Sequence, residues 1–230
     1  IADFPAEMAP YYPPAYFRPE RSDRLRAPAW AYTLFDVPAV MQEVRRAFPP
    51  GAAPLTNERL AELLAAQVLR HYLPDWVERK EAAILDVGCG RGGLIHALTR
   101  LGYAHVQGVD LYLDAPIHYT NGVAVHKGTI HEMPPGWDLI MLHHAFEHMP
   151  DPLDVLAAVA QRLAPGGLCL IRIPIVPSLA WERYGVDWVQ WDAPRHFFLH
   201  SVQSLTLLAE QAGLRVEQHF CDSTPFQFVG

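Results

Sequence analysis

The chain has 230 residues, half of them hydrophobic, and a formal net charge of −7 at neutral pH. This length and composition suit one α/β domain with a sizeable core and an N-terminal extension. The acidic balance argues against broad nucleic-acid binding, which usually needs a basic face, and the sequence has no apolar run of about 18 residues to span a membrane.

The chain is interpreted as an N-terminal extension with a helical cap, residues 1–80, followed by the main domain, residues 81–230. The start is rich in proline and aromatic residues, and it lacks the basic segment and apolar core of a signal peptide. The first expected helices cover Phe35–Phe48 and Asn57–Tyr72, the second with apolar residues on one face. Pro74 stops that second helix.

From residue 83 onward, strand and helix patterns alternate. The expected strands are Ala83–Val87, His105–Asp110, Val123–Lys127, Trp137–His143, Leu168–Ile173, Leu214–Cys221 and, at the end of the chain, Thr224–Val229. The expected helices are Gly93–Leu101, Leu153–Leu163 and Ser201–Ala212. This alternation predicts an α/β fold with a seven-stranded, mostly parallel sheet and helices on both faces.

Three cysteines, an odd number without the spacing of metal ligands, fit a reducing compartment: Cys89, Cys169 and Cys221. We therefore expect a cytoplasmic protein. Four arginines lie close together near the N-terminus: Arg18, Arg21, Arg24 and Arg26. Glu20 and Asp23 reduce the local positive charge. The group indicates either a solvent-exposed face or a binding site for an anionic substrate.

A glycine-rich turn joins the first expected strand of the main domain to its helix. Gly88, Gly90 and Gly92 alternate after Asp86, and a second acid, Asp110, ends the next strand. Glycines let the backbone approach a ligand closely, because a Cβ would block that approach. A carboxylate after the second strand is placed to accept both hydroxyls of a ribose. The whole pattern predicts a nucleotide-binding βαβ unit.

Two classes of cofactor fit this turn. Gly88, Gly90 and Gly93 satisfy the dinucleotide fingerprint, so NAD is one candidate. An acid at position 86 would repel the pyrophosphate of a dinucleotide, whereas it would attract the ammonium and sulfonium of S-adenosylmethionine. A structural turn without a ligand is the third interpretation. The charge of Asp86 favours S-adenosylmethionine.

Four motifs in order resemble those of the class I S-adenosylmethionine-dependent methyltransferases. They are the glycine turn Asp86–Gly92, the segment Asp138–Pro152 with its Glu-His-x-x-Asp-Pro ending, the turn Leu163–Gly167, and Trp188–His196. The last segment, which reads W-x-x-x-D-x-P-R-H, is similar to a subgroup often associated with glycans or sugar-containing metabolites. The resemblance covers roughly residues 80 to 230. It implies a Rossmann-like fold, S-adenosylmethionine as methyl donor and S-adenosylhomocysteine as product.

The resemblance also implies a set of cofactor-binding residues: Asp86, Gly88, Cys89, Gly90, Asp110, Leu111, Thr129, Ile130, Leu142 and His143. Asp86 would reach the cofactor ammonium, and Asp110 would accept the ribose hydroxyls as a charged acceptor. Thr129 departs from the pattern, because many relatives have an acid there for the adenine amino group. Cys89 is interpreted as a small residue of the turn and not as a nucleophile.

The acceptor side is expected in the segment 174–200, which is long for a connection and predicts a lid. Aromatic side chains concentrate there, either to contact a sugar ring or planar substrate or to cover the sheet edge: Trp181, Tyr184, Trp188, Trp191, Phe197 and Phe198. Histidine accepts protons near neutral pH. We interpret His196 as the general base or the residue that orients the acceptor hydroxyl, with His144 and His148 as further catalytic candidates; a structural histidine is the alternative.

The segment His144-x-x-Glu147-His148 also matches a zinc-protease pattern. A buried strand precedes it, and Pro150 and Pro152 truncate any helix, so a protease is not favoured. It is more similar to the Glu-x-x-Glu-His of small-RNA 2′-O-methyltransferases and ubiquinone-pathway O-methyltransferases, although His144 replaces the first Glu and His196 would have to stand in for a later histidine. Many relatives keep Glu-His without a metal, so we assign no metal ligand and interpret Glu147 and His148 as hydrogen-bonding residues.

The sequence thus predicts an S-adenosylmethionine-dependent methyltransferase that acts on oxygen. The expected acceptor is a sugar, a glycan precursor or a related small metabolite, and no nucleic-acid partner is expected. Three alternatives stay open: a metal-assisted RNA 2′-O-methyltransferase, an NAD-dependent oxidoreductase and a non-catalytic cofactor-binding module, which would tolerate the loss of His196. A metal would assist the first by lowering the pKa of the acceptor hydroxyl.

Overall fold

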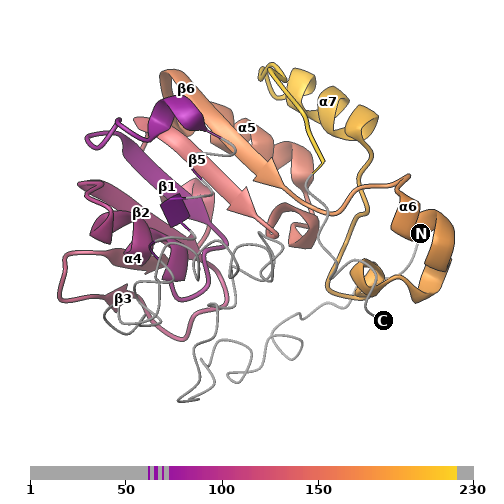
Figure 1. Cartoon of the computed structure of the whole chain (residues 1–230), viewed down its shortest axis with the longest axis horizontal. Coiled ribbons are helices and arrows are strands. Elements are labelled where there is room, and N and C mark those ends of the chain that lie inside the picture. The colour runs from indigo at the N-terminus through magenta and orange to yellow at the C-terminus, as the bar shows by residue number, and fades with distance from the viewer. Residues whose placement is uncertain (1–61, 63–64, 67–68, 70–72, 222–230) are drawn as a thin grey trace, which may run out of the picture.

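The computed structural model describes residues 62, 65, 66, 69 and 73–221. Within these residues, the strands are β1 (Ala83–Val87), β2 (His105–Asp110), β3 (Ile117–His118), β4 (Ala124–Lys127), β5 (Trp137–His143) and β6 (Leu163–Arg172). They form one sheet of order β3-β4-β2-β1-β5-β6, shown in Figure 1. Only the pairing of β3 with β4 is antiparallel.

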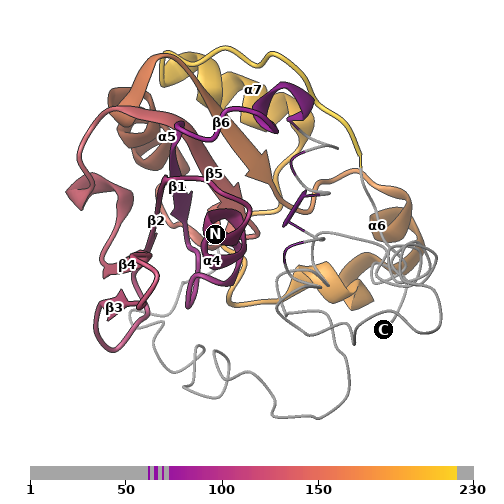
Figure 2. The same cartoon turned by 60° about the vertical axis from the view of Figure 1, so that its left-hand side comes forward.

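Within residues 73–221 the α-helices are α4 (Gly93–Arg100), α5 (Pro152–Arg162), α6 (Leu179–Tyr184) and α7 (Val202–Gln211). Short 3₁₀ helices are η3 (Pro74–Trp76), η4 (Ile130–Glu132), η5 (Phe146–His148), η6 (Gly185–Asp187) and η7 (Val189–Trp191). Helix α4 covers one face of the sheet, whereas α5 and α7 lie together on the other, as Figures 1 and 2 show. None of the described helices has the length and apolar character needed to cross a membrane.

The core consists of two apolar layers, one on each face of the sheet. Alternate residues of β1 point to opposite layers, so that Ile84 packs with α4 whereas Leu85 packs with α5. Strand β5 behaves in the same way, and its residues 139–142 are fully buried. Continuous apolar runs of this kind are typical of parallel strands that are covered on both faces.

The arrangement of the strands places the carboxyl ends of β1 and β5 at a switch point. The chain runs from β1 outward to β2 and β4 on one side, and from β5 outward to β6 on the other. Ligands of open parallel sheets bind at such a point, beyond the carboxyl ends of the strands. Asp86 lies near this end of β1, in register with Gly108 of β2 and Met141 of β5.

Five of the expected strands are present, and the sheet has six strands among the described residues, so the expected seven strands are not confirmed. The segment Leu214–Cys221 forms no strand; Val216 and Phe220 are both more than 40% exposed, so pairing there would bury little apolar surface. The sixth strand is instead β3, which pairs with β4. It has only two residues, too few to show the alternation of apolar and polar residues by which a strand is recognised in a sequence. The expected strand Thr224–Val229 lies outside the described residues.

Strand β6 begins five residues earlier than expected, at Leu163, so the turn motif Leu163–Gly167 belongs to the strand itself. The ladder with β5 shifts register there, with Trp137 opposite Leu163 but Leu139 opposite Leu168. A bulge of this kind absorbs extra residues within a pairing. The sequence pattern suggested a separate turn because Pro165 and the two glycines usually interrupt strands.

The remaining helices agree with the expectations in part. Helices α4, α5 and α7 lie within one or two residues of the expected ranges. The described residues of the expected helix Asn57–Tyr72 are helical, and the expected helix Phe35–Phe48 lies outside the described part of the chain. The segment 174–200, called the lid below, contains α6, η6 and η7 where no regular structure was expected. Ser178 starts α6 by accepting a hydrogen bond from the Trp181 amide.

Candidate active site

The glycine turn after β1 has a backbone conformation that favours glycine. Gly88, Gly90 and Gly92 have φ angles of 73°, 55° and 77°, a region that side chains with a Cβ rarely occupy. A Cβ on Gly88 would also overlap the Cβ of Ala145, which follows β5. The turn therefore packs directly against the segment that follows β5, and larger side chains are excluded from the contact.

Two buried carboxylates flank this turn. Asp110, at the end of β2, accepts hydrogen bonds from the amide of Gly90 at Oδ2 (2.8 Å) and from the amide of Tyr112 at Oδ1 (2.9 Å). Burial raises the pKa of Asp110, although these backbone donors oppose that rise. Burial, together with the charge of Asp110, raises the pKa of Asp86 to about 8. Two acids so close together in a buried site suit a cationic ligand, as the sequence predicts.

The other residues expected at the cofactor differ in whether the side chain or only the backbone is accessible to a ligand. Leu111 is 51% exposed, so its side chain is available to a ligand. Ile130 and Leu142 are buried in the core on the α5 face, so at these positions only the backbone is available. Cys89 packs against Gly108, and burial raises the pKa of its thiol well above the ordinary value. A thiol that keeps its proton is a poor nucleophile, which agrees with a packing role for Cys89.

Thr129 takes part in a capping interaction at the start of η4. Its amide and hydroxyl lie 3.3 Å and 3.4 Å from Oε1 of Glu132. Many proteins of the resembled class have an acid at position 129 itself. Here the nearby acid is Glu132, three residues further along the chain, which the sequence interpretation did not single out. The pattern Thr-x-x-Glu, which is typical of a capping box, could have identified Glu132 from the sequence.

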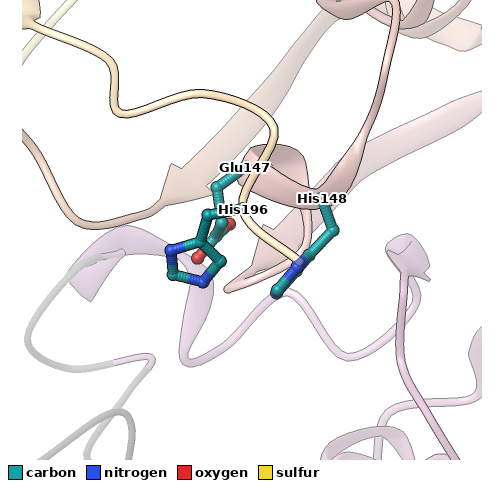
Figure 3. A group of neighbouring side chains, drawn as sticks. All are labelled: Glu147, His148 and His196. Atoms are coloured by element: carbon teal, nitrogen blue, oxygen red, sulfur yellow. The ribbon is translucent and has the colours of Figure 1, made fainter. Parts of the chain in front are cut away.

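A cluster of one acid and two histidines forms where η5 meets the lid. Glu147, His148 and His196 each offer one ligand-type atom, and these atoms lie within 4.8 Å of one another. Figure 3 shows the three side chains converging from η5 and from the loop that carries His196. The lid is held there by the amide of Phe197, which donates to the carbonyl of Glu147 at 2.9 Å. The structure thus brings together two of the three predicted catalytic histidines.

Backbone carbonyls orient both imidazole rings of this cluster. His148 Nδ1 lies 3.0 Å from the carbonyl oxygen of Arg195, and His196 Nδ1 lies 2.7 Å from that of Gln190. A carbonyl only accepts hydrogen bonds, so each Nδ1 carries the hydrogen and each neutral ring has its lone pair on Nε2. Burial lowers the pKa of His196, although the nearby Glu147 opposes the shift. His196 is therefore a neutral proton acceptor at neutral pH.

Glu147 is fully buried, and its Oε2 has no hydrogen-bond partner among the described residues. His144 Nδ1 lies 3.3 Å from Oε1, and a hydrogen bond from His144 helps to hold the pKa of Glu147 down. The interpretation of Glu147 as a hydrogen-bonding side chain stays a prediction. Burial opposes the charge of the carboxylate, but His144 and then His148 and His196 lower the pKa of Glu147 below its ordinary value. A buried negative charge thus faces the two imidazoles.

The third predicted histidine, His144, lies behind Glu147 and not in the cluster. Its φ angle of 49° is unusual for a residue with a side chain. Arg172 at the end of β6 places Nη1 2.5 Å from Nε2 of His144. Arginine only donates, so the His144 hydrogen is on Nδ1 and faces Glu147. The sequence analysis did not identify Arg172 as a site residue. A charged residue at the end of an apolar strand was the feature that could have indicated it.

His143, expected beside the methionine part of the cofactor, is buried, and neither ring nitrogen has a hydrogen-bond partner in the described part of the chain. Burial, followed by the charges of Arg172 and His144, lowers the pKa of His143 to about 3. Its ring is therefore neutral. An unpaired polar group in such a position is costly unless a ligand supplies the missing hydrogen bond.

The acid–histidine cluster lies next to the glycine turn. Ala145 packs on Gly88, and the charge of His148 affects the pKa of Asp110. A Rossmann-like sheet, a turn with buried acids beyond its carboxyl edge, and proton acceptors beside that turn define a cofactor-dependent enzyme of the class I methyltransferase type.

A family model described as a methyltransferase domain matches residues 56–219. The chain therefore belongs to this methyltransferase family. The ubiquinone biosynthesis O-methyltransferase of Xylella fastidiosa strain M23 is 35% identical over 107 residues, which are 42% of this chain and 43% of that protein. The protein of the same name from Saccharophagus degradans is 36% identical over 109 residues, 42% of this chain and 45% of that protein. The chain thus matches less than half the length of these curated relatives.

Among solved structures, magnesium protoporphyrin IX methyltransferase from Synechocystis, with bound S-adenosylhomocysteine, aligns with a TM-score of 0.54 at 15% identity. The alignment covers 82% of this chain and 90% of that one. The Rossmann-like fold is therefore confirmed. Together with the family match, it identifies the chain as a methyltransferase domain. The oxidoreductase alternative is not supported. The individual site residues and the division at residue 80 stay predictions.

Proposed function

We propose that the chain transfers the methyl group of S-adenosylmethionine to a hydroxyl oxygen of a small molecule. One observation carries this proposal: a ring nitrogen of His196 and the buried carboxylate of Glu147 lie within 4.8 Å of each other, on a segment that packs against the glycine turn. Methylation of a hydroxyl requires a proton acceptor, whereas methylation of a neutral amine leaves its proton to be lost afterwards. The names of the curated relatives, which are O-methyltransferases, support the same acceptor atom.

In the proposed reaction the hydroxyl oxygen attacks the methyl carbon in line with the carbon–sulfur bond. The new carbon–oxygen bond forms as the carbon–sulfur bond breaks, and its electron pair stays on sulfur, which leaves neutral S-adenosylhomocysteine. The hydroxyl proton passes to Nε2 of His196. Glu147 stabilises the resulting imidazolium by its negative charge, and the carbonyl of Gln190 keeps the ring in the required orientation. His148 lies against His196, with ring centroids 4.7 Å apart, and limits its movement.

The cofactor is proposed to lie across the ends of β1 and β2. Asp110 uses one lone pair of each oxygen for the amides of Gly90 and Tyr112, and a second lone pair remains on each for a ribose hydroxyl. Asp86 attracts the ammonium group. Gly88, Cys89 and Gly90 line the methionine part through the backbone, Leu111 covers the adenine, and the remaining contacts are assigned to Thr129, Ile130, Leu142 and His143.

The proposed acceptor is a sugar, a glycan precursor or a related small metabolite with a ring. The rings of Trp181 and Trp191 stack in the lid with centroids 5.5 Å apart and an angle of 17°. Trp191 is still 40% exposed, so one of its faces or edges is available to a second ring. Gln190, next to Trp191, orients His196. The lid therefore connects a ring-binding surface with the proton acceptor.

The proposal is tested with labelled S-adenosylmethionine and a panel of acceptors. The panel contains nucleotide sugars, free glycosides, catechols and primary amines, and mass spectrometry locates the added methyl group. We expect O-methyl products from hydroxyl acceptors with a ring. Transfer only to amines, or to none of the hydroxyl compounds while the cofactor is bound, would reject an oxygen acceptor of this kind. Products from catechols but not from sugars would retain the oxygen atom and replace the sugar class.

A further inference from the structure

We propose that Glu147, His148 and His196 form a binding site for one divalent transition-metal ion. The ligands are a carboxylate oxygen of Glu147 and Nε2 of both histidines. The site is defined by the protein alone and does not depend on the identity of the acceptor. Its role in catalysis, argued below, rests on the proposed function.

The distances between the ligand atoms suit a shared ion. The three atoms lie within 4.8 Å of one another. An ion at the centre of a triangle of that size is at most about 2.8 Å from each corner, so each atom moves by about 0.7 Å to reach the 2.0–2.2 Å of metal–nitrogen and metal–oxygen bonds. Small rotations of the side chains supply such a movement. The positions shown in Figure 3 therefore need no change of the backbone.

Both imidazoles are held in the tautomer that a metal needs. The carbonyls of Arg195 and Gln190 accept the Nδ1 hydrogens of His148 and His196. Histidines that bind metals almost always donate their second ring hydrogen to a carbonyl or a carboxylate in this way. The two rings meet at an angle of 66° with centroids 4.7 Å apart, so they are not stacked. One ring nitrogen of each histidine and a carboxylate oxygen of Glu147 lie within 4.8 Å of one another.

The electrostatics of the cluster call for a cation. Glu147 is 0% exposed, and its Oε2 has no hydrogen-bond partner among the described residues. A buried carboxylate with so few donors is expensive unless a positive charge compensates it. The compensation from within the described residues is incomplete, because the His144 contact reaches only Oε1, at 3.3 Å. Three groups that all present lone pairs to one point are stabilised by a cation there.

The ligand set indicates which ions fit. Two imidazoles and one carboxylate favour Zn²⁺, Mn²⁺, Fe²⁺ or Co²⁺, whereas Mg²⁺ prefers oxygen ligands throughout. Three protein ligands leave coordination positions for water or a substrate oxygen. An acceptor hydroxyl bound at such a position has a lowered pKa and loses its proton to solvent. In the metal-bound protein the Nε2 lone pair of His196 then serves the ion and no longer accepts the proton.

The competing arrangement is an ion pair within the lid. Asp192 Oδ2 lies 3.7 Å from His196 Nε2, so a protonated His196 has a partner other than Glu147. Asp192 is, however, already bound to Arg195, whose Nε donates to Oδ1 at 3.0 Å. If this ion pair is the actual state of His196, the cluster binds no metal. Metal titration separates the two states directly.

The test uses the full chain, stripped with chelator and dialysed, and titrated with Zn²⁺, Co²⁺ or Mg²⁺ alone. We expect one equivalent of Zn²⁺ by elemental analysis, visible absorption of bound Co²⁺ at the same stoichiometry, and no saturable binding of Mg²⁺. Glu147→Gln and His196→Gln should each weaken Zn²⁺ binding by about 100-fold. His131→Gln is the matched control, because His131 lies away from the cluster in an ion pair with Asp154, and it should bind Zn²⁺ as the wild type does.

Three results distinguish this inference from the proposed function. No Zn²⁺ or Co²⁺ binding, or equal binding by His196→Gln and the wild type, overturns the metal site. Methyl transfer to a hydroxyl that persists at full rate in chelator keeps the proposed function and removes the ion from it. Metal binding without any hydroxyl methylation keeps the site and rejects the proposed function. If Glu147→Gln does not fold, His148→Gln provides the same comparison, since His148 is partly exposed.

Discussion

Gly88 and Ala145 lie so close together that a Cβ on Gly88 would overlap the Cβ of Ala145. This contact joins the turn after β1 to the segment after β5, which continues into η5 with Glu147 and His148. This close approach, together with the pairing of β1 with β5, fixes the proposed cofactor site and the acid–histidine cluster relative to each other. In-line methyl transfer requires that alignment, because the acceptor oxygen, the methyl carbon and the sulfur must lie on one line.

Gly88→Ala should destabilise the protein and weaken cofactor binding. The new methyl group overlaps Ala145, and the φ angle of 73° adds backbone strain. We expect a loss of about 2–4 kcal/mol in the free energy of unfolding. The control is Gly102→Ala, where φ is 94° but no atom lies within 4 Å of the new Cβ. Denaturant unfolding of both variants separates strain from overlap, and equal losses would show that the contact with Ala145 is unimportant.

Asp110→Ala should weaken the binding of S-adenosylmethionine by about 1–3 kcal/mol, the cost of losing a charged hydrogen-bond acceptor in a buried site. The amides of Gly90 and Tyr112 lose their acceptor in the same variant, so some loss of stability accompanies the effect. Calorimetric titration measures the dissociation constant, with the exposed neighbour Asp114→Ala as control. An unchanged dissociation constant in Asp110→Ala would refute the ribose assignment.

Cofactor binding should release a proton at pH 7. Burial and the charge of Asp110 raise the pKa of Asp86 to about 8, so the carboxyl group is mostly protonated before a cationic ligand binds and ionised afterwards. Affinity should therefore increase as the pH rises toward about 8 and then level off. Titration in buffers with different ionisation enthalpies measures the released proton. Asp86→Asn should show neither the release nor this pH dependence, and a wild type that behaves like this variant would contradict the assignment.

The same raised pKa has a consequence for stability. The folded state holds its Asp86 proton up to about pH 8, whereas the unfolded chain loses it near the ordinary pKa of 3.8. Between these values the folded state binds more protons, so the contribution of Asp86 to the free energy of unfolding falls as the pH rises. We expect the difference in stability between Asp86→Asn and the wild type to grow in favour of the variant over this range. Thermal unfolding at several pH values without cofactor measures it, and a constant difference would contradict the raised pKa.

His196→Gln should lower kcat by about 10²- to 10⁴-fold, the usual contribution of a general base. Cofactor affinity should stay unchanged, because the contacts of His196 are made to Gln190, Asp192 and His148 within the lid and cluster. Steady-state kinetics and a cofactor titration on the same sample provide the comparison, with His131→Gln as the matched substitution. Wild-type turnover in His196→Gln would remove this residue from the reaction.

Local features of the sequence were sufficient for most of the fold. The apolar runs of β1 and β5 and the periodic faces of α4, α5 and α7 depend on neighbours within a few residues, so they can be recognised without the tertiary structure. Failures occurred at the edges of the sheet. Strand β3 is too short to show an alternating hydrophobic pattern. The segment Leu214–Cys221 has the sequence pattern of a strand but does not pair with the sheet. Pairing at an edge depends on what lies alongside, which no local pattern contains.

The sequence by itself determined the glycine turn, its two acids and hence a positively charged cofactor, since these residues are close along the chain or end adjacent strands. Only the tertiary structure decided which histidine meets which acid. His196 is 49 residues from Glu147, and the lid loop brings them together through the Phe197 amide and the Glu147 carbonyl. The same fold separates His144 from the cluster and places it against Arg172. The orientation of the His148 and His196 rings depends on the backbone carbonyls of Arg195 and Gln190. Every residue has such a carbonyl, so the sequence does not show which one a histidine contacts.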